Sequence, residues 1–510
     1  MKPERSRSIP FPRRLGRLGL RLLRWALLLG VAIVVGFTLY ALTALPDLEP
    51  WHTERLDGEF NAARDAGLDF DGYRKLEAGL FDEMRAKIAR WNRADEAFVY
   101  SRFNPASATS RLTEGAPYNR SFRLTLDKPL GHALLMHGLT DSPYSMKALA
   151  EALHARGFEV TVLRLPGHGT LPSMMVEMSA RDWTAAVRLA ARDVAARTPL
   201  GQPFYIGGYS TGGTLALQYT LDALGDATLR KPDRVLLMSP AIEIARVAAI
   251  ANVLDTLSVI PIPLLEKVRW QDVAVEYDPY KFNSFPVNAT RQVNRATRGL
   301  QRAIVEATES GRIDRMPPVV TWQSVVDSTV GTTGVADLLY AHLRGASHRL
   351  VLFDVNRYGA LAALQRPRAG ALIERLATGV HGYTLDVVTN TGPMDRHVSV
   401  RELAPDGTSS VRDTQLSWPE TLVSLGHVAV PFPPDDPAYG LVPGSGRAGL
   451  ASIGTWLFRG ESGAVTVSLA SLTRPRSNPF WPLVDEEIAR FVGADLARAP
   501  DTAPAGTAAR

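Results

Sequence analysis

From about residue 120 onward, short apolar runs alternate with segments whose apolar residues recur at helical spacing. The runs HALLMHG (132–138), PFYIGGYS (203–210) and HRLVLFDV (348–355) are typical of buried strands, and segment 180–197 has the pattern of an amphipathic helix. Parallel strands need a long crossover connection, which a helix usually supplies. The alternation therefore predicts the α/β class, with a mostly parallel central sheet and helices on both faces.

Composition and charge narrow the class of protein further. Of the 510 residues, 45% are hydrophobic and 21% charged, as in an ordinary globular protein. The chain has no cysteine, which excludes disulfides, thiolate metal sites and a cysteine nucleophile. The formal net charge of +5 comes from residues 1–24, which hold eight Lys and Arg against the single acid Glu4. Because the remainder is close to neutral, we expect no nucleic-acid partner.

An uncharged apolar run extends from Trp25 to Leu45. As a helix it would be about 30 Å long, which matches the hydrocarbon core of a bilayer. Basic residues precede it and acidic residues follow it, so the positive-inside rule predicts a cytoplasmic N-terminus and a far-side (periplasmic, if Gram-negative) main domain. The alternatives are a cleaved signal peptide and a buried core helix. We expect a single-pass membrane anchor, because the run is long and no clear A-x-A cleavage site follows it.

The rest of the chain divides into an extension, a main domain with two insertions, and a tail. Apolar residues in 71–93 recur every three or four positions, which predicts a helix that packs on the main domain. The second insertion includes the strand-like runs YTLDVVTN and RHVSVREL. The expected segments are a basic cytoplasmic segment (1–24), a transmembrane helix (25–45), a linker with a helical extension (46–115), an α/β domain (116–495) with a helical insertion (245–316) and a second insertion (about 360–420), and a disordered tail (496–510).

The segment GYSTG matches the motif G-x-S-x-G and lies between an apolar strand and a helical pattern. In that context the serine stands on a tight turn, with its hydroxyl projecting outward and the N–H groups of the new helix aimed at the site. A Walker A motif would need Lys-Ser/Thr where this chain has Thr214 and Leu215, and the dinucleotide fingerprint needs another glycine spacing. We therefore predict that Ser210 is a nucleophile. The alternative is a glycine-rich turn.

A second loop, HGLTDSP at 137–143, follows a strand and precedes a helix. A backbone N–H of such a loop, with the N–H of the residue after the nucleophile, can stabilise the oxyanion of a tetrahedral intermediate. The loop stands one strand–helix unit plus one strand ahead of the Ser210 turn, where such an oxyanion hole would lie. The sequence thus assigns the backbone N–H groups of Leu139 and Thr211 as donors, against the alternative of a plain turn.

Four motifs together resemble the α/β-hydrolase superfamily: HGLTDSPYSM, RLPGHG, GGYSTGG and SVVDSTV. Over residues 116–244 and 317–358, and again around 420–495, the chain is similar to the branch of monoacylglycerol lipases, lysophospholipases and small bacterial carboxylesterases. The resemblance implies an α/β-hydrolase fold, with 245–316 as a helical cap. It also implies hydrolysis of ester bonds.

In that family the acid follows the strand after the cap, and the histidine lies in a loop after the last strand. By this resemblance Asp327 is the acid that orients the catalytic imidazole, with a helix-capping role as the alternative. His427, in SLGHV, completes the chain order Ser, Asp, His, with His397 as the alternative. The gap of 100 positions between Asp327 and His427 exceeds the roughly 30 of related enzymes, and an insertion at 360–420 would explain it.

These residues predict a membrane-anchored serine hydrolase that cleaves carboxylic esters, such as monoacylglycerol or lysophospholipid, through an acyl-enzyme. An acyltransferase or a peptidase would use the same triad, and an inactive hydrolase fold would serve as an interaction module. No metal-ligand spacing such as H-E-x-x-H occurs, and the mechanism needs no cofactor. The apolar run 253–265 further predicts that the cap forms a lid that favours acyl-chain substrates.

Overall fold

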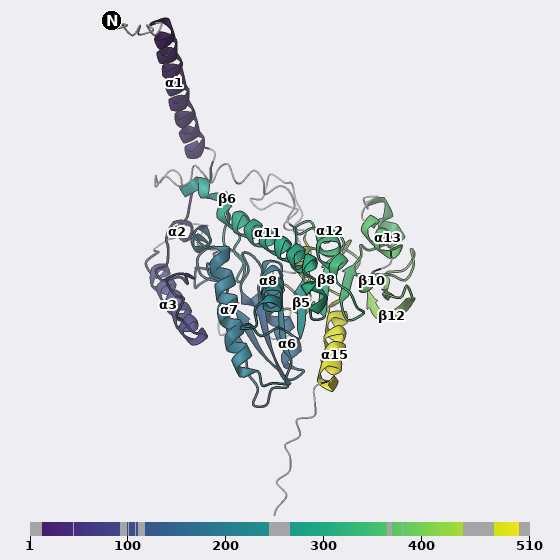
Figure 1. Ribbon diagram of the computed structural model, residues 1–510. Helices are drawn as coiled ribbons and strands as arrows, with labels where there is room; N and C mark the ends of the chain where they lie inside the picture. The colour runs from purple at the N-terminus through teal and green to yellow at the C-terminus, as the bar shows by residue number, and fades with distance from the viewer. Residues whose placement is uncertain are drawn as a thin grey trace, which may run out of the picture.

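A ten-stranded sheet with helices on both faces lies at the centre of the molecule (Figure 1). The strand order is β1-β3-β2-β4-β5-β8-β9-β10-β11-β12. Neighbouring strands from β3 to β10 are parallel, whereas β1 at one edge and β11 and β12 at the other are antiparallel. The predicted α/β class is thus confirmed. This computed structural model describes residues 13–43, 45–91, 99, 101–107, 109–110, 118–243, 266–364, 370–379, 381–441 and 474–498.

Most predicted strands and helices are found close to their expected bounds. The strands of the sheet are β1 (Phe122–Leu124), β2 (Gly131–Met136), β3 (Phe158–Leu163), β4 (Phe204–Tyr209), β5 (Arg234–Met238), β8 (Val319–Ser324), β9 (Arg349–Phe353), β10 (Thr384–Asn390), β11 (His397–Leu403) and β12 (Ser409–Ser417). The main helices are α1 (Arg13–Thr43), α2 (Pro50–Thr53), α3 (Phe70–Ile88), α6 (Lys147–His154), α7 (Ala180–Arg197), α8 (Thr211–Gly225), α11 (Val287–Glu309), α13 (Ala371–Ala377) and α15 (Trp481–Arg498).

The central parallel strands are buried on both faces, which explains why their sequences are continuous apolar runs. Every residue of β2 is buried. Because successive side chains point to opposite faces, Leu134 and Met136 join one core cluster, and Ala133 and Leu135 join the other. Helices α7, α8 and α11 cover the first cluster, and α6 and α15 cover the second. The carboxyl ends of the strands are therefore left to loops, which is where α/β sheets place their sites.

Strands β10, β11 and β12 lengthen the central sheet within the segment 360–420. β10 pairs in parallel with β9, and β11 and β12 follow it as antiparallel strands. The runs YTLDVVTN and RHVSVREL, which were expected to be strand-like, are β10 and β11. β12 is mostly exposed and polar, as suits the free edge of a sheet. The parallel sheet therefore continues beyond the run 348–355, and this segment is part of it.

Residues 46–68, the first part of the expected linker and helical extension (46–115), are packed into the domain. Trp51 is fully buried, and its ring centroid lies 6.0 Å from that of Trp91. Glu59 accepts two hydrogen bonds, of 3.0 and 2.9 Å, from the completely buried guanidinium group of Arg164. These contacts join residues far apart in sequence, and no periodic pattern in the segment predicts them.

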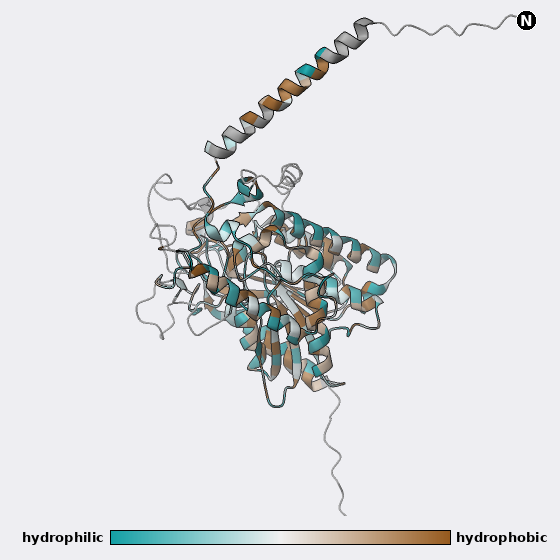
Figure 2. Cartoon of the chain, turned by 90° about the vertical axis from the view of Figure 1, so that its left-hand side faces the viewer, coloured by the Kyte–Doolittle hydropathy of each residue, from teal (hydrophilic) through white to brown (hydrophobic). Residues whose placement is uncertain are grey.

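Helix α1 projects from the domain (Figures 1 and 2). Its apolar side chains Leu22, Leu27, Leu28 and Leu29 are each more than half exposed. Across the described residues, however, no helix combines the length and apolarity that crossing a membrane requires. The transmembrane helix expected at 25–45 is therefore not confirmed.

The described part of the cap, residues 266–316, is mostly helical and also contains a small ribbon. Strands β6 (Trp270–Asp272) and β7 (Phe285–Pro286) pair in antiparallel orientation, although the sequence showed no obvious strand there, and α11 follows. The apolar run 253–265, on which the lid prediction rests, lies outside the described residues. So do residues 499–510 of the predicted tail.

Candidate active site

Ser210 stands at the turn between β4 and α8, with φ of 52° and ψ of −116°. A non-glycine residue in such a conformation is strained by roughly 1–3 kcal/mol and persists only where its surroundings hold it. Its N–H donates to the Met238 carbonyl over 3.0 Å, and its carbonyl accepts the N–H groups of Thr214 (3.2 Å) and Ala241 (3.1 Å). These bonds fix the turn to the end of β5 and to the first turn of α8. The backbone thus has the strained strand-to-helix turn expected of a nucleophile elbow.

Two glycines allow the elbow to pack tightly. A Cβ on Gly208 would overlap the backbone of Gly212, and a Cβ on Gly212 would overlap the carbonyl of Met136 at the end of β2. The start of α8 therefore lies against the end of β2, which the loop with Leu139 follows. Thr211 is the first residue of α8, so its N–H has no partner within the helix. The loops that carry the two predicted oxyanion donors are thus adjacent.

His137 has a structural position beside this loop. The Leu165 N–H donates to its Nε2 over 2.9 Å, so Nδ1 carries the ring hydrogen and donates to the Gly138 carbonyl over 2.8 Å. Burial lowers the pKa of His137 well below the usual value, and the neighbouring His168 lowers it further. A neutral imidazole fixed at both nitrogens shapes the loop and is not free to act as a base.

Asp327 and His427 are in direct contact. Asp327 lies in the turn after β8, and His427 begins a short 3-10 turn after β12. The His427 Nδ1 donates to Asp327 Oδ2 over 2.7 Å, and the Gln323 amide donates to the same oxygen over 3.1 Å. The ring of Tyr209, the residue before Ser210, lies 5.0 Å from the His427 ring between centroids. With Nδ1 engaged, Nε2 is the nitrogen of His427 that remains for a serine hydroxyl.

The environment of Asp327 keeps its carboxyl group charged. Its side chain is completely buried, which by itself raises the pKa, but the adjacent His427 and two backbone N–H groups lower the pKa by more. Those N–H groups belong to Thr329 (2.9 Å) and Val330 (3.0 Å), and both donate to Oδ1. An ionised, buried carboxylate is suited to orienting an imidazole and to stabilising its cation.

The long gap between the acid and the histidine is spanned by strands β9 to β12. After β12 the chain returns to the end of β8, where the Ser324 hydroxyl donates to the Leu425 carbonyl over 2.8 Å. Leu425 is fully buried and lies two residues before His427. The histidine loop is thus fixed next to the strand that carries Asp327, despite the separation of 100 residues.

The alternative histidine, His397, lies elsewhere. It begins β11, three strands away from β8 in the sheet, and its backbone N–H donates to Asp395 Oδ1 over 2.8 Å. The structure therefore brings Asp327 together with His427 rather than with His397. Their catalytic roles remain predictions until activity is measured.

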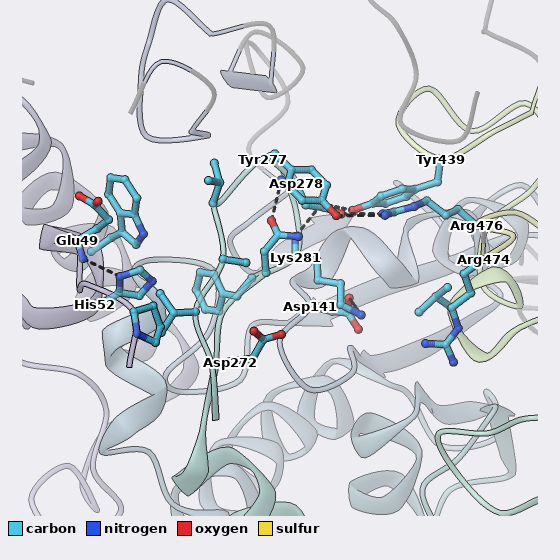
Figure 3. Close-up of a pocket in the computed structure, with 18 of the residues that line it drawn as sticks. Glu49, His52, Asp141, Asp272, Tyr277, Asp278, Lys281, Tyr439, Arg474 and Arg476 are labelled. Atoms are coloured by element: carbon cyan, nitrogen blue, oxygen red, sulfur yellow. Dashed lines mark hydrogen bonds and ion pairs between the residues drawn. The ribbon is translucent and has the colours of Figure 1, made fainter. Parts of the chain in front are cut away.

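A cavity of about 600 Å³ borders the elbow (Figure 3). Its wall includes Tyr209 and Val428, the sequence neighbours of Ser210 and His427, which themselves lie beside the cavity rather than in its lining. Its lining combines aromatic and apolar side chains with charged ones. The charged side chains are Asp47, Glu49, Asp141, Asp272, Asp278, Lys281, Arg474 and Arg476.

Sequence reasoning missed most of this lining. Asp141 belongs to the HGLTDSP loop that was singled out, and its carboxylate lies 3.9 Å from the Lys281 ammonium. Burial raises the pKa of Asp141, and Lys281 partly offsets the shift. Lys281 and Arg476 come from segments with no motif, so no local signal identified them. Across the part of the chain that the structure describes, no group of three His, Asp or Glu could hold a metal ion.

Comparisons with known proteins show sequence similarity to a hydrolase family and to a lipase. Residues 127–338 match the family model described as serine aminopeptidase, S33. A thermostable monoacylglycerol lipase of Bacillus sp. (strain H-257) is 40% identical over 89 residues, which cover 18% of this chain and 34% of the relative. The chain thus spans about a third of the length of the curated relative it matches.

The solved structures that the chain matches include one described under the metagenome-derived lipolytic enzymes LipS and LipT, and the monoacylglycerol lipase of Paleococcus ferrophilus. Both are 22% identical, with TM-scores of 0.37 and 0.35. They cover 47% and 46% of this chain and 89% and 88% of their own.

The parallel sheet and the elbow give this chain the architecture of an α/β-hydrolase domain, and residues 127–338 are similar to a family of serine hydrolases. Within that class, the chain resembles the branch of monoacylglycerol lipases and esterases.

Proposed function

We propose that this protein is an esterase that cleaves carboxylic esters through Ser210, His427 and Asp327. The observation that carries the proposal is the 2.7 Å contact between His427 Nδ1 and the buried Asp327 carboxylate, beside a strained serine turn. Such a set of nucleophile, base and orienting acid is recognised by its geometry rather than by sequence position.

In the proposed mechanism, His427 Nε2 takes the Ser210 hydroxyl proton while the Ser210 oxygen attacks the ester carbonyl. The N–H groups of Leu139 and Thr211 stabilise the oxyanion that forms. His427 then gives its proton to the leaving alcohol, which leaves an acyl-enzyme. Water, activated by the same histidine, hydrolyses that intermediate and restores Ser210. Asp327 stays ionised throughout and stabilises the imidazolium.

The proposed substrates are lipid esters with a single acyl chain, such as monoacylglycerols or lysophospholipids. The support is the similarity to a monoacylglycerol lipase, together with a cavity of about 600 Å³ beside the elbow. Cavities of roughly 300–1,000 Å³ hold small organic ligands. Each acyl methylene group that becomes buried would add about 0.8 kcal/mol of binding free energy.

The test is a panel of p-nitrophenyl esters from C2 to C12 and of glycerol esters, assayed with the full chain and with Ser210→Ala. We expect hydrolysis that rises with chain length, and a loss of kcat on the order of 10⁴–10⁶ in the variant. If Ser210→Ala keeps a tenth of the activity, Ser210 is not the nucleophile. Absence of hydrolysis in the intact protein would favour a non-catalytic interaction module instead.

A peptidase is the second candidate function, because the matching family model is described as a serine aminopeptidase. The five carboxylates around the cavity, against three cationic side chains, would also suit a substrate with a free amine. Aminoacyl p-nitroanilides added to the same panel separate the two functions. Faster cleavage of these amides than of matched esters would replace the esterase proposal, and addition of alcohol acceptors would detect acyl transfer.

We further propose that α1 anchors the protein in a membrane, with the N-terminus in the cytoplasm and the catalytic domain on the other side. The support is the exposure of the α1 leucines, since such a surface is costly in water, and the basic residues 1–24 that precede it. A C-terminal alkaline phosphatase fusion should be active and a green fluorescent protein fusion dark. The opposite pair of results would overturn the topology.

A further inference from the structure

The chain that follows α1 forms one wall of the cavity beside the active site. Pro46, Asp47, Glu49, Trp51 and His52 all line it. In Figure 3, the side chains of Glu49 and His52 lie on one side of the cavity, and those of Tyr439, Arg474 and Arg476 lie on the other. The short helix α2, which contains the tryptophan and the histidine, is therefore part of the substrate cavity.

This wall is firmly attached to the cap. The Glu49 N–H donates to His52 Nδ1 over 2.9 Å, so Nε2 carries the ring hydrogen and donates to the Ser284 hydroxyl over 2.8 Å. Burial lowers the pKa of His52 to about 3, so the ring stays neutral. Asp47 pairs with the Lys267 ammonium over 2.8 Å. The contacts join the segment to residues just before each of the two strands of the β6–β7 ribbon.

The cavity wall begins within three residues of the end of α1. That helix ends at Thr43, and Pro46 already lines the cavity. Three residues of fully extended chain span at most about 11 Å. Helix α1 leaves the domain on the side that carries α2 and β6 (Figure 1). The rim of the cavity and the end of the exposed apolar helix are thus close in space whatever direction α1 takes.

We propose that the cavity opens onto the bilayer that α1 enters, so that the enzyme takes its ester directly from the lipid phase. The inference rests on the proposed esterase activity and membrane anchor. It narrows the substrate class to membrane-resident esters of long acyl chains. A phospholipid surface is the partner of this face, because the α1 leucines require an apolar environment and only a short stretch of chain separates the end of α1 from the cavity.

The first experiment moves the cavity away from the bilayer. A Gly-Ser linker of about 16 residues, with ends roughly 20 Å apart on average, is inserted between Thr43 and Pro46. The matched control carries the same linker ahead of Arg13. Both proteins and the parent are placed in phosphatidylcholine vesicles that contain a long-chain monoacylglycerol, and each is also assayed with p-nitrophenyl acetate in water.

We expect the linker after Thr43 to lower kcat/KM for the vesicle substrate at least tenfold, with p-nitrophenyl acetate hydrolysis within twofold of the parent. The control should match the parent on both substrates. Equal loss on both substrates, or no loss on either, would overturn the inference while leaving the esterase proposal intact. Failure of the parent to hydrolyse p-nitrophenyl acetate would instead overturn the proposed function, and the inference with it.

A second measurement does not depend on catalysis. Because the chain has no cysteine, Asp47→Cys and Leu200→Cys each accept one polarity-sensitive fluorophore. The Asp47 side chain is 97% exposed at the cavity rim. Leu200 is 94% exposed and precedes the amino end of β4, which is the end of that strand opposite the Ser210 elbow. In vesicles, we expect a blue-shifted emission for the label at 47 only. Equal spectra at the two positions would contradict the inference.

Discussion

The two sides of the active site reach their positions by different physical means. Ser210 is fixed by local backbone sterics, because its strand, turn and helix are continuous in sequence and only glycine fits at 208 and 212. His427 and Asp327 are brought together across 100 residues by side-chain hydrogen bonds and by four intervening strands. The position of the proposed nucleophile therefore follows from a local motif, whereas the contact of the proposed acid and base depends on the whole sheet.

The contact between Asp327 and His427, which joins distant parts of the chain, is tested most sharply by comparing two histidine variants. His427→Ala should lower kcat on the order of 10⁴–10⁶, because nucleophile and base act as one unit. His397→Ala is the matched control, since that residue lies three strands away from Asp327, and its kcat should stay within about threefold of the parent. Steady-state kinetics on a short p-nitrophenyl ester measures both. Loss of activity in the His397 variant alone would mean that the wrong loop had been assigned.

The tight packing of the Ser210 elbow should not tolerate a single added methyl group. In Gly212→Ala the new Cβ meets the Met136 carbonyl, which is backbone and cannot move aside, so we expect a loss of about 1–3 kcal/mol in the free energy of unfolding. Gly79→Ala is the control, because that glycine is exposed in α3 with open space around it, and it should gain about 0.5–1 kcal/mol. Urea unfolding followed by circular dichroism gives both values. Equal stability of the two variants would contradict the steric account.

The smallest expected effect concerns the link between β8 and the histidine loop. Ser324→Ala removes the hydrogen bond to the Leu425 carbonyl and leaves that buried group without its partner, which should cost about 1–2 kcal/mol. We expect kcat to fall by more than KM changes, because the His427 loop loosens while the cavity stays. Ser410→Ala, in the exposed strand β12, should change neither quantity. If both serine variants behave alike, this bond does not position the loop.

The same contrast explains what sequence alone could predict of the fold. The central strands and helices have strong periodicity, and α7 was predicted with its bounds of 180 and 197. Packing between segments that are distant in sequence produces no such periodic pattern. Trp51 and Glu59 occur in a segment without periodicity, and only their partners in the folded chain reveal that it belongs to the domain.

In the candidate site, too, the features that the sequence predicts are those formed by residues close together in the chain. The elbow at Ser210 and the adjacent loop with Leu139 follow from short motifs. The pairing of His427 with Asp327 was expected from chain order and family resemblance. The reason for the long gap, a continued sheet, needed the structure. The cavity lining, with Lys281 among its charges, comes from several segments that no single motif unites.

The most direct test of the central claim is covalent labelling of the full chain with a fluorophosphonate, followed by mapping of the modified peptide by mass spectrometry. A serine activated by a histidine–aspartate pair reacts with such a probe, whereas an ordinary serine does not. We predict one label per chain on Ser210, no label in Ser210→Ala, and strongly reduced labelling in His427→Ala. A label on another serine, or undiminished labelling of Ser210→Ala, would contradict the account.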